Sequence, residues 1–239
     1  MVINGLRARV LLALICCTSM VGMLGCGNGF SLVDTGSIFQ MPWQEKPDTM
    51  PGVVPPHERI AQLRETASSS KKLEPAEQES LSQRLAKEIS DEADPLIRLE
   101  IVRAISVCNT PTAAKIIEAA LSDTSADVRI TACQVLGKRG GSQSVQLLSK
   151  TLASDISADV RLAATRALGE TGDKAAVAGL SVALEDGDPA MQHMGVLSMK
   201  KCTNEDFGKD VGRWRQYARG ETPAPPEPTS IADRIRELF

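Results

Sequence analysis

The sequence predicts an all-α protein, a solenoid of about four stacked helix pairs with flexible segments at both ends. The main observation is a repeat, because residues 127–137 (DVRITACQVLG) and 159–169 (DVRLAATRALG) share six of eleven positions at an offset of 32 residues. A fixed period in this range is typical of repeat arrays. The second is composition, since 42% of the residues are apolar but only 3% are aromatic. A core of small aliphatic side chains suits closely stacked helices.

Residues 1–25 are predicted to be a signal peptide. Arg7 and Arg9 give a positive start, and a mainly apolar run continues to Leu24. The segment Met23-Leu24-Gly25-Cys26 resembles the lipobox of bacterial lipoproteins, which implies cleavage before Cys26 and lipidation of its thiol. Ordinary cleavage and an uncleaved anchor are the alternatives, although the run is shorter than the roughly 20 residues that a membrane span needs. We therefore expect an exported protein, lipid-anchored to a bacterial membrane and facing the periplasm or the cell exterior.

Residues 26–56 are predicted to be a disordered, lipid-attached tether. Their prolines at 42, 47, 51, 55 and 56 cannot continue a helix or a central strand. As a flexible coil such a segment reaches about 30 Å, which leaves the folded part free to search the membrane surface. A short helix and linker are expected to follow at 57–72.

Residues 73–203 are predicted to hold the array. Arg98, Arg129 and Arg161 recur at offsets of 31 and 32, and each begins an apolar helical pattern. In each unit we call the first helix A and the second helix B. Helix B is expected to end at glycines, near 137–140 and 169–172. One helix pair cannot bury its apolar faces alone, so stacking supplies the core.

Polar residues of the array are interpreted first as structural. Asp127, Asp159 and Asp188 stand where helix B needs an N-cap. We expect each repeated arginine to bond to the acidic cap of a neighbouring unit and so fix the register, with an anion-binding ladder as the alternative. In the degenerate fourth unit, Ala190 is aligned with the arginines and Leu197 with Leu168. The same alignment puts His193 at a buried or half-buried position.

The Ala-Asp-Val-Arg start of helix B, its Leu-Gly-x-x-Gly end and the period of about 31 residues resemble HEAT-like repeats. The closest resemblance is to the short type also found in phycobilisome lyases. It implies a right-handed α-solenoid whose B helices line the concave face. Because that family includes scaffolds, adaptors, chromophore lyases and regulators, it implies little about function. From this register, the candidate partner-binding residues are Gln134, Lys138, Arg166 and Glu170.

Three further segments are expected after the array. Residues 204–220 are predicted to form a capping helix whose Trp214 and Tyr217 close the apolar end. Residues 221–229 form a proline-rich, extended spacer. Residues 230–239 (SIADRIRELF) are predicted to be a short amphipathic helix, and ten residues rarely hold a helix alone in water. It is expected to fold on the solenoid, in a partner's groove or on the bilayer, or else to stay disordered.

No catalytic constellation is found. The sequence has no G-x-S-x-G, P-loop, H-E-x-x-H or C-x-x-C motif and only two histidines, so no enzyme activity, cofactor or metal is expected. Removal of Arg7 and Arg9 leaves 25 basic and 30 acidic side chains, which disfavours nucleic acid as a partner. Cys133 is predicted to be a small core residue. A Cys108–Cys133 disulfide and a reactive, thioether-forming cysteine stay open, and Cys202 is the third cysteine of the array.

These observations predict a non-enzymatic protein-binding scaffold or adaptor, tethered to the bacterial cell envelope, that binds an unknown protein through its helical-repeat surface. The alternative is a lyase-like or enzyme-accessory module that holds a substrate protein or chromophore. The first function predicts a partner on exposed helix B residues. The second predicts a polar pocket and a reactive thiol.

Overall fold

The computed structural model describes residues 54–223, 230–232 and 235. The predicted signal peptide, Cys26 and the tether up to residue 53 lie outside the described residues. Among the described residues, the helices of eight or more residues lie in the compact unit Thr49–Phe239. Within the described part of the chain they are α1 (Pro56–Ser70), α2 (Pro75–Asp91), α3 (Pro95–Ile105), α4 (Pro111–Ala120), α5 (Ala126–Arg139), α6 (Gly141–Ser154), α7 (Ala158–Glu170), α8 (Ala176–Glu185), α9 (Pro189–Thr203) and α10 (Val211–Ala218).

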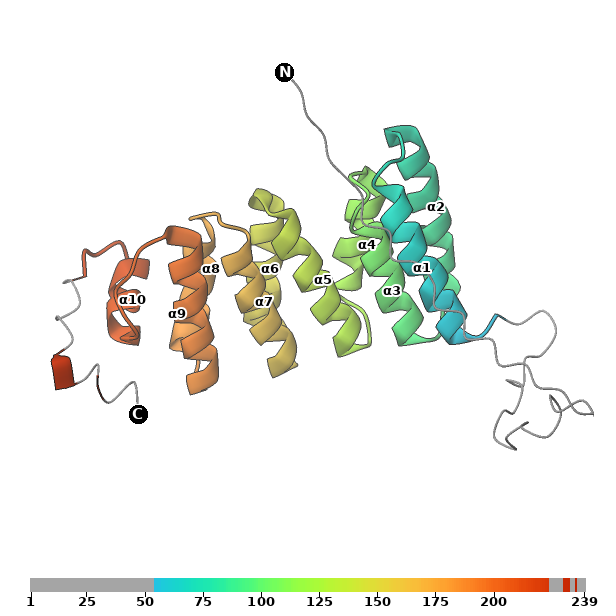
Figure 1. The fold of residues 1–239 in the computed structure, drawn as a ribbon. Helices are drawn as coiled ribbons and strands as arrows, with labels where there is room; N and C mark the ends of the chain where they lie inside the picture. The colour runs from blue at the N-terminus through green and yellow to red at the C-terminus, as the bar shows by residue number, and fades with distance from the viewer. Residues whose placement is uncertain (1–53, 224–229, 233–234, 236–239) are drawn as a thin grey trace, which may run out of the picture. The chain divides into compact units, whose positions relative to one another are not determined.

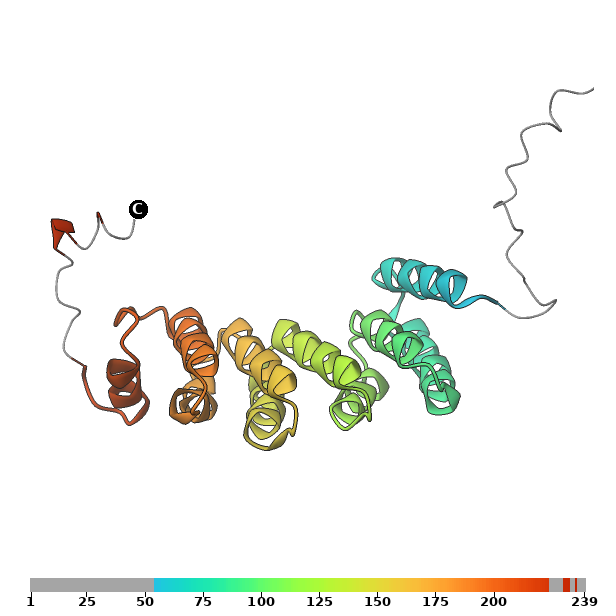
Figure 2. The same ribbon diagram turned by 90° about the horizontal axis from the view of Figure 1, so that it is seen from below.

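The helices alternate between two layers (Figure 1, Figure 2). In the first, α3 packs against α1 and α5, and α7 packs against α5 and α9. In the second, α2 packs against α4, and α8 packs against α6 and α10. The four A–B pairs are α2–α3, α4–α5, α6–α7 and α8–α9, with α1 added to the B layer and α10 to the A layer. The described residues contain no strand, and the predicted all-α solenoid is confirmed.

The core follows the repeat. Each fully buried Leu or Ile side chain contributes roughly 1.5–3 kcal/mol to folding, so rows of such residues hold the layers together. Residues at one register in successive B helices are buried together. Three such rows are Ile97, Val128, Val160 and Met191; Ile101, Ala132, Ala164 and Gly195; and Ile105, Leu136, Leu168 and Met199.

These rows show that the predicted alignment of the fourth repeat is wrong by two residues. Gln192, rather than Ala190, occupies the arginine position, because its Nε2 donates to the carbonyl oxygen of Asp186 at 2.7 Å. His193 and Leu197, which were expected at core positions, are exposed. The error arises because methionines at 191 and 199 fill the core positions that leucine and valine fill elsewhere.

The predicted N-caps are correct at only one helix. Asp188 caps α9, since its carboxylate accepts the N–H of Ala190 at 2.9 Å. Asp127 and Asp159 are instead the second residues of α5 and α7, and Ser125 and Ser157 hold the cap positions. Both aspartates are exposed there, where a negative charge is favourable beside the positive end of the helix dipole.

The glycines of helix B have two different roles. Gly140 and Gly172 follow α5 and α7 with φ values of 65° and 66°, a conformation that glycine adopts without strain. Gly137 and Gly169 lie inside the helices and allow close approach. A methyl group on Gly169 would lie 2.7 Å from the Cα of Ser198 in the next B helix.

The C-terminal end of the array is closed by aromatic rings. Trp214 of α10 is fully buried, and its ring centroid lies 5.0 Å from that of Phe207 and 6.0 Å from that of Tyr217. Its Nε1 donates to the carbonyl oxygen of Gly208 at 3.0 Å. Arg215 donates from Nε and Nη2 to the carbonyl oxygen of Leu184, the last buried residue of α8. Residues 204–220 therefore cap the A layer.

Beyond the cap, residues 224–229 lie outside the described part. In the segment 230–239, the described residues 231, 232 and 235 are helical. Ile231 and Ile235 are 78% and 52% exposed, so neither is buried against the array. None of the helices described is both long and apolar enough to cross a membrane.

The contact at Gly169 gives the first prediction. Gly169→Ala should lower the free energy of unfolding by roughly 1–2 kcal/mol, because a backbone atom must move and overpacking outweighs the gain of about 1 kcal/mol in helix propensity. Chemical denaturation measures this. Gly187→Ala is the control, since nothing lies within 4 Å of a methyl group there. Equal stability of the two variants would contradict close packing of α7 on α9.

Candidate functional site

The exposed surface of the B helices is the candidate site, and we call it the B face. It consists of the outward positions of α3, α5, α7 and α9, which are exposed or half-buried while the intervening positions are buried. These positions are Leu96, Leu99 and Arg103 on α3; Asp127, Ile130, Gln134 and Lys138 on α5; Asp159, Leu162, Arg166 and Glu170 on α7; and Ala190, His193, Leu197 and Lys201 on α9.

All four candidate partner-binding residues lie on the B face and are exposed. Gln134 and Lys138 share one side of α5 and line a hollow of about 430 Å³ between α3 and α5. Arg166 and Glu170 lie on the same side of α7. Glu170 Oε1 is 3.9 Å from Lys201 Nζ, whereas Gln134, Lys138 and Arg166 have no side-chain hydrogen bond or ion pair within the described residues.

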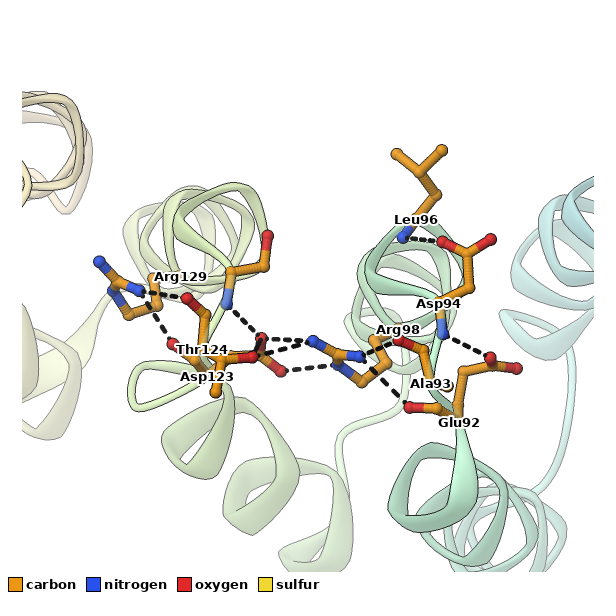
Figure 3. A network of polar contacts seen from close by, with 9 residues as sticks. Glu92, Ala93, Asp94, Leu96, Arg98, Asp123, Thr124 and Arg129 are labelled. Atoms are coloured by element: carbon orange, nitrogen blue, oxygen red, sulfur yellow. Dashed lines mark hydrogen bonds and ion pairs between the residues drawn. The ribbon is translucent and has the colours of Figure 1, made fainter.

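The repeated arginines lie between repeats rather than on the B face. Arg98 donates from Nε and Nη2 to the carboxylate of Asp123 at 2.9 and 2.8 Å (Figure 3). Arg129 binds Asp155 in the same way at 2.8 and 3.0 Å. Each arginine also donates from Nη1 to carbonyl oxygens of its own A–B turn, such as Asp123 for Arg129 at 2.9 Å. One guanidinium therefore joins two successive turns.

These arginine–carboxylate pairs form a ladder that runs from repeat to repeat. Its carboxylates were not predicted. The expected partners Asp127, Asp159 and Asp188 do not bind the arginines. Asp123, Asp155 and Asp186 of the A–B turns do, although the Arg161–Asp186 pair is wider at 3.9 Å. They recur at offsets of 32 and 31, which is the signal that could have identified them. The partner does lie in the neighbouring repeat, as expected.

The ladder is charged at neutral pH. The hydrogen bond from Arg98 lowers the pKa of Asp123. At Asp155, burial acts to raise the pKa, but hydrogen bonds from Arg129 and from the Ser157 N–H outweigh it and the pKa is lowered. Because these guanidinium groups are already paired, the ladder is a structural device and not a free anion site.

A second ion-pair cluster attaches α1 to the array. Glu100 of α3 is buried, and its Oε1 accepts hydrogen bonds from Arg64 at 2.7 Å and Arg103 at 3.0 Å. Burial acts to raise its pKa, and the two arginines together lower it. Leu63, which precedes Arg64 on α1, is buried. Arg103 thus belongs both to this attachment and to the edge of the B face.

The A layer is less continuous than the B layer. The helices α4 and α6 barely contact each other, and hollows of about 380 and 400 Å³ lie along the space between them. Leu147 lines both hollows, and the Arg129–Asp155 pair lines the first. Their linings mix hydroxyl, aliphatic and already paired charged groups, and no nucleophile and base converge there.

The thiols are placed as core residues rather than reactive groups. Cys108, Cys133 and Cys202 are buried and free, so the structure lacks the Cys108–Cys133 bridge that the sequence left open. Burial raises the pKa of Cys133 to about 12 and that of Cys202 to about 11. Since the thiolate is the nucleophile, such thiols are unreactive. In the part of the chain described, no group of three or more metal-binding side chains comes together.

The ladder gives the second prediction. Arg129→Met should lower the free energy of unfolding by about 2–4 kcal/mol, because it leaves the carboxylate of Asp155 largely buried without its cation. Arg161→Met is the matched control, and its wide, more exposed pair should cost about 1 kcal/mol or less. Urea denaturation of both variants measures the difference. Equal losses would contradict the greater structural role of the Arg129 pair.

Comparison with known families agrees with this architecture. Residues 82–169 match the family model described as HEAT repeats, and residues 160–186 match that of the PBS lyase HEAT-like repeat. No curated protein matches the chain. The two matched segments run from the middle of α2 to the end of α8, and this part of the array is similar to HEAT repeats.

Proposed function

We propose that this protein is a non-enzymatic scaffold or adaptor, tethered to the bacterial cell envelope, that binds a protein partner on its B face. HEAT repeats suggest a helical-repeat scaffold for protein–protein interaction. Three long polar side chains of the B face take no part in holding the fold together. Gln134, Lys138 and Arg166 are exposed and form no internal polar contact among the described residues. This observation carries the proposal.

The structural arginines provide the contrast. Arg98 and Arg129 are fixed by bidentate pairs and carbonyl contacts inside the stack, so they hold the fold. On the B face, Gln134, Lys138 and Arg166 form no such bond among the described residues. They alternate with half-buried Ile130 and Leu162, which supplies the mixture of apolar contact and polar edge that protein interfaces use.

The alternative function is a lyase-like or enzyme-accessory module, and the similarity of residues 160–186 to the PBS lyase HEAT-like repeat favours it. Such a module needs a reactive thiol or a polar pocket around its substrate. The three thiols described are buried with no role on the B face, and burial raises the pKa of Cys133 and Cys202. The scaffold is therefore the function that the geometry supports better.

Partner capture tests the proposal. Crosslinking in native membranes, followed by purification, should recover a protein whose yield falls about tenfold when Gln134→Ala, Arg166→Glu and Glu170→Arg are combined; a tenfold loss corresponds to about 1.4 kcal/mol. Lys115→Glu on exposed α4 is the control that changes charge away from the B face. Loss only in a chain lacking residues 222–239 would assign binding to the tail. A co-purified small molecule without a protein partner would support the alternative.

The tether is tested separately. Membrane attachment is proposed to depend on a lipid on Cys26, on the strength of the lipobox-like Leu24-Gly25-Cys26 sequence after an apolar run. Cys26→Ser should abolish metabolic labelling with a radioactive fatty acid and move the protein to the soluble fraction. Cys202→Ser is the control for cysteine loss as such. Unchanged labelling and fractionation of Cys26→Ser would refute the lipid anchor.

A further inference from the structure

We propose that the occupant of the B face is an amphipathic helix of the partner, which lies across the B helices with an apolar side chain every seventh residue and edges of opposite charge. This inference rests on the proposed function, because it describes the partner of the same surface. It is argued from three features of that surface: an apolar row, the separation of charges on its two sides, and the spacing of the helices.

The apolar row crosses the middle of the B face. Leu99, Ile130 and Leu162 occupy one register in α3, α5 and α7, where each is half-buried and packs partly on the core. In α9 the same register holds the exposed His193, while Leu96 on α3 and Leu197 on α9, which are 56% and 46% exposed, add apolar surface one helical turn before and one helical turn after this register. The apolar row therefore runs through the B helices of the first three repeats, α3, α5 and α7.

Charges of opposite sign flank this row. On the side where the B helices begin, Asp127 and Asp159 are exposed and form no ion pair within the described residues. On the side where the helices end, the exposed side chains are mainly basic. They are Arg103, Lys138, Arg166 and Lys201, with Glu170 as the one carboxylate, 3.9 Å from Lys201. A partner that fits needs a basic edge and an acidic edge.

The spacing of the row selects a helix. Packed helices lie about 8–10 Å apart, so the apolar residues of neighbouring B helices recur at about that distance. Seven residues of an α-helix rise about 10.5 Å and return to nearly the same face. In a strand, side chains on one face recur at roughly 6.6 or 13 Å, and neither distance matches. A heptad spacing of apolar residues therefore fits the array.

The two separate charged edges also distinguish this partner from a membrane surface. An anionic lipid surface would favour a uniformly basic face, whereas Asp127 and Asp159 would repel it. A helix with two different edges can satisfy both sides at once. Because the two sides of the B face carry opposite charges, the bound helix also has a defined direction along the array. Exchange of the acidic and basic edges of the helix should reverse that direction.

Designed peptides test this inference. Three helical peptides of about three heptads carry the same apolar residues at every seventh position, with one basic and one acidic edge, two basic edges, or two acidic edges. Binding to the full chain is measured by fluorescence anisotropy. The mixed-edge peptide should bind at least tenfold more tightly than either of the others. Equal affinities of all three peptides would overturn the proposal.

Reversal of charge on the B face provides a second test, in which the expected result is a change of peptide preference. A variant that merely unfolded would lose binding to all the peptides. Asp127→Lys combined with Asp159→Lys should transfer the preference to the peptide with two acidic edges, by about tenfold. Circular dichroism verifies that the array stays folded. Glu118→Lys on exposed α4 is the control and should leave the preference unchanged. If the double variant still bound the mixed-edge peptide most tightly, the proposal would be overturned.

Direction is tested with a photocrosslinker at the peptide N-terminus. In the mixed-edge peptide it should label one end of the B face, α3 or α9, and in the edge-exchanged peptide the opposite end. Labelling of the same end by both peptides would contradict the proposed role of the edges. If capture of the natural partner depended on Arg166 but the three peptides bound equally, this inference would be refuted and the proposed function would stand. If the B-face substitutions left capture of the partner unchanged, the proposed function itself would be refuted.

Discussion

A single helix pair of this protein has no core of its own, and the rest of the structure depends on that constraint. The helices are mostly 10–15 residues long, and their apolar faces are built from small aliphatic side chains. Helices of this length are marginal alone in water, so neighbouring repeats must supply the second wall of every core row. The close approach of α7 and α9 at Gly169 and Ser198 shows how tightly this is done.

Stacking creates two problems that the chain solves with polar and aromatic groups. Apolar rows do not fix the angle between one repeat and the next, and the bidentate pairs of Arg98 and Arg129 with the following turns do so with directed bonds. The ends of the stack would leave apolar surface in water. The helix α1, attached through Glu100, covers the first B helix, and the rings around Trp214 cover the end of the A layer.

The residues that hold the repeats together are different from those on the outward side of the B helices, which leaves the B face available for function. The bonds that hold the array run between turns and between adjacent helices, so substitutions on the outward side of α5 or α7 leave them intact. Repetition then places equivalent side chains at regular distances along the surface. Leu99, Ile130 and Leu162 form a row for the same reason that Ile101, Ala132 and Ala164 form a core row.

The sequence by itself determined the helices, their pairing and the repeat, because these follow from the periodicity of apolar residues within a repeat of about 31 residues. The exposed positions Gln134, Lys138, Arg166 and Glu170 also followed from that register. In the fourth repeat the same reasoning failed at His193 and Leu197, since methionine fills core positions there and the apolar pattern no longer marks the inward side.

Only the tertiary structure decided which groups from different repeats meet. The arginines bind Asp123 and Asp155 rather than the predicted Asp127 and Asp159, because a helix residue and a turn about 25 residues later converge only when the repeats stack. The free thiols and the central row of the B face were decided in the same way. Local sequence specifies a helix, but contact between helices depends on packing geometry that no single segment contains.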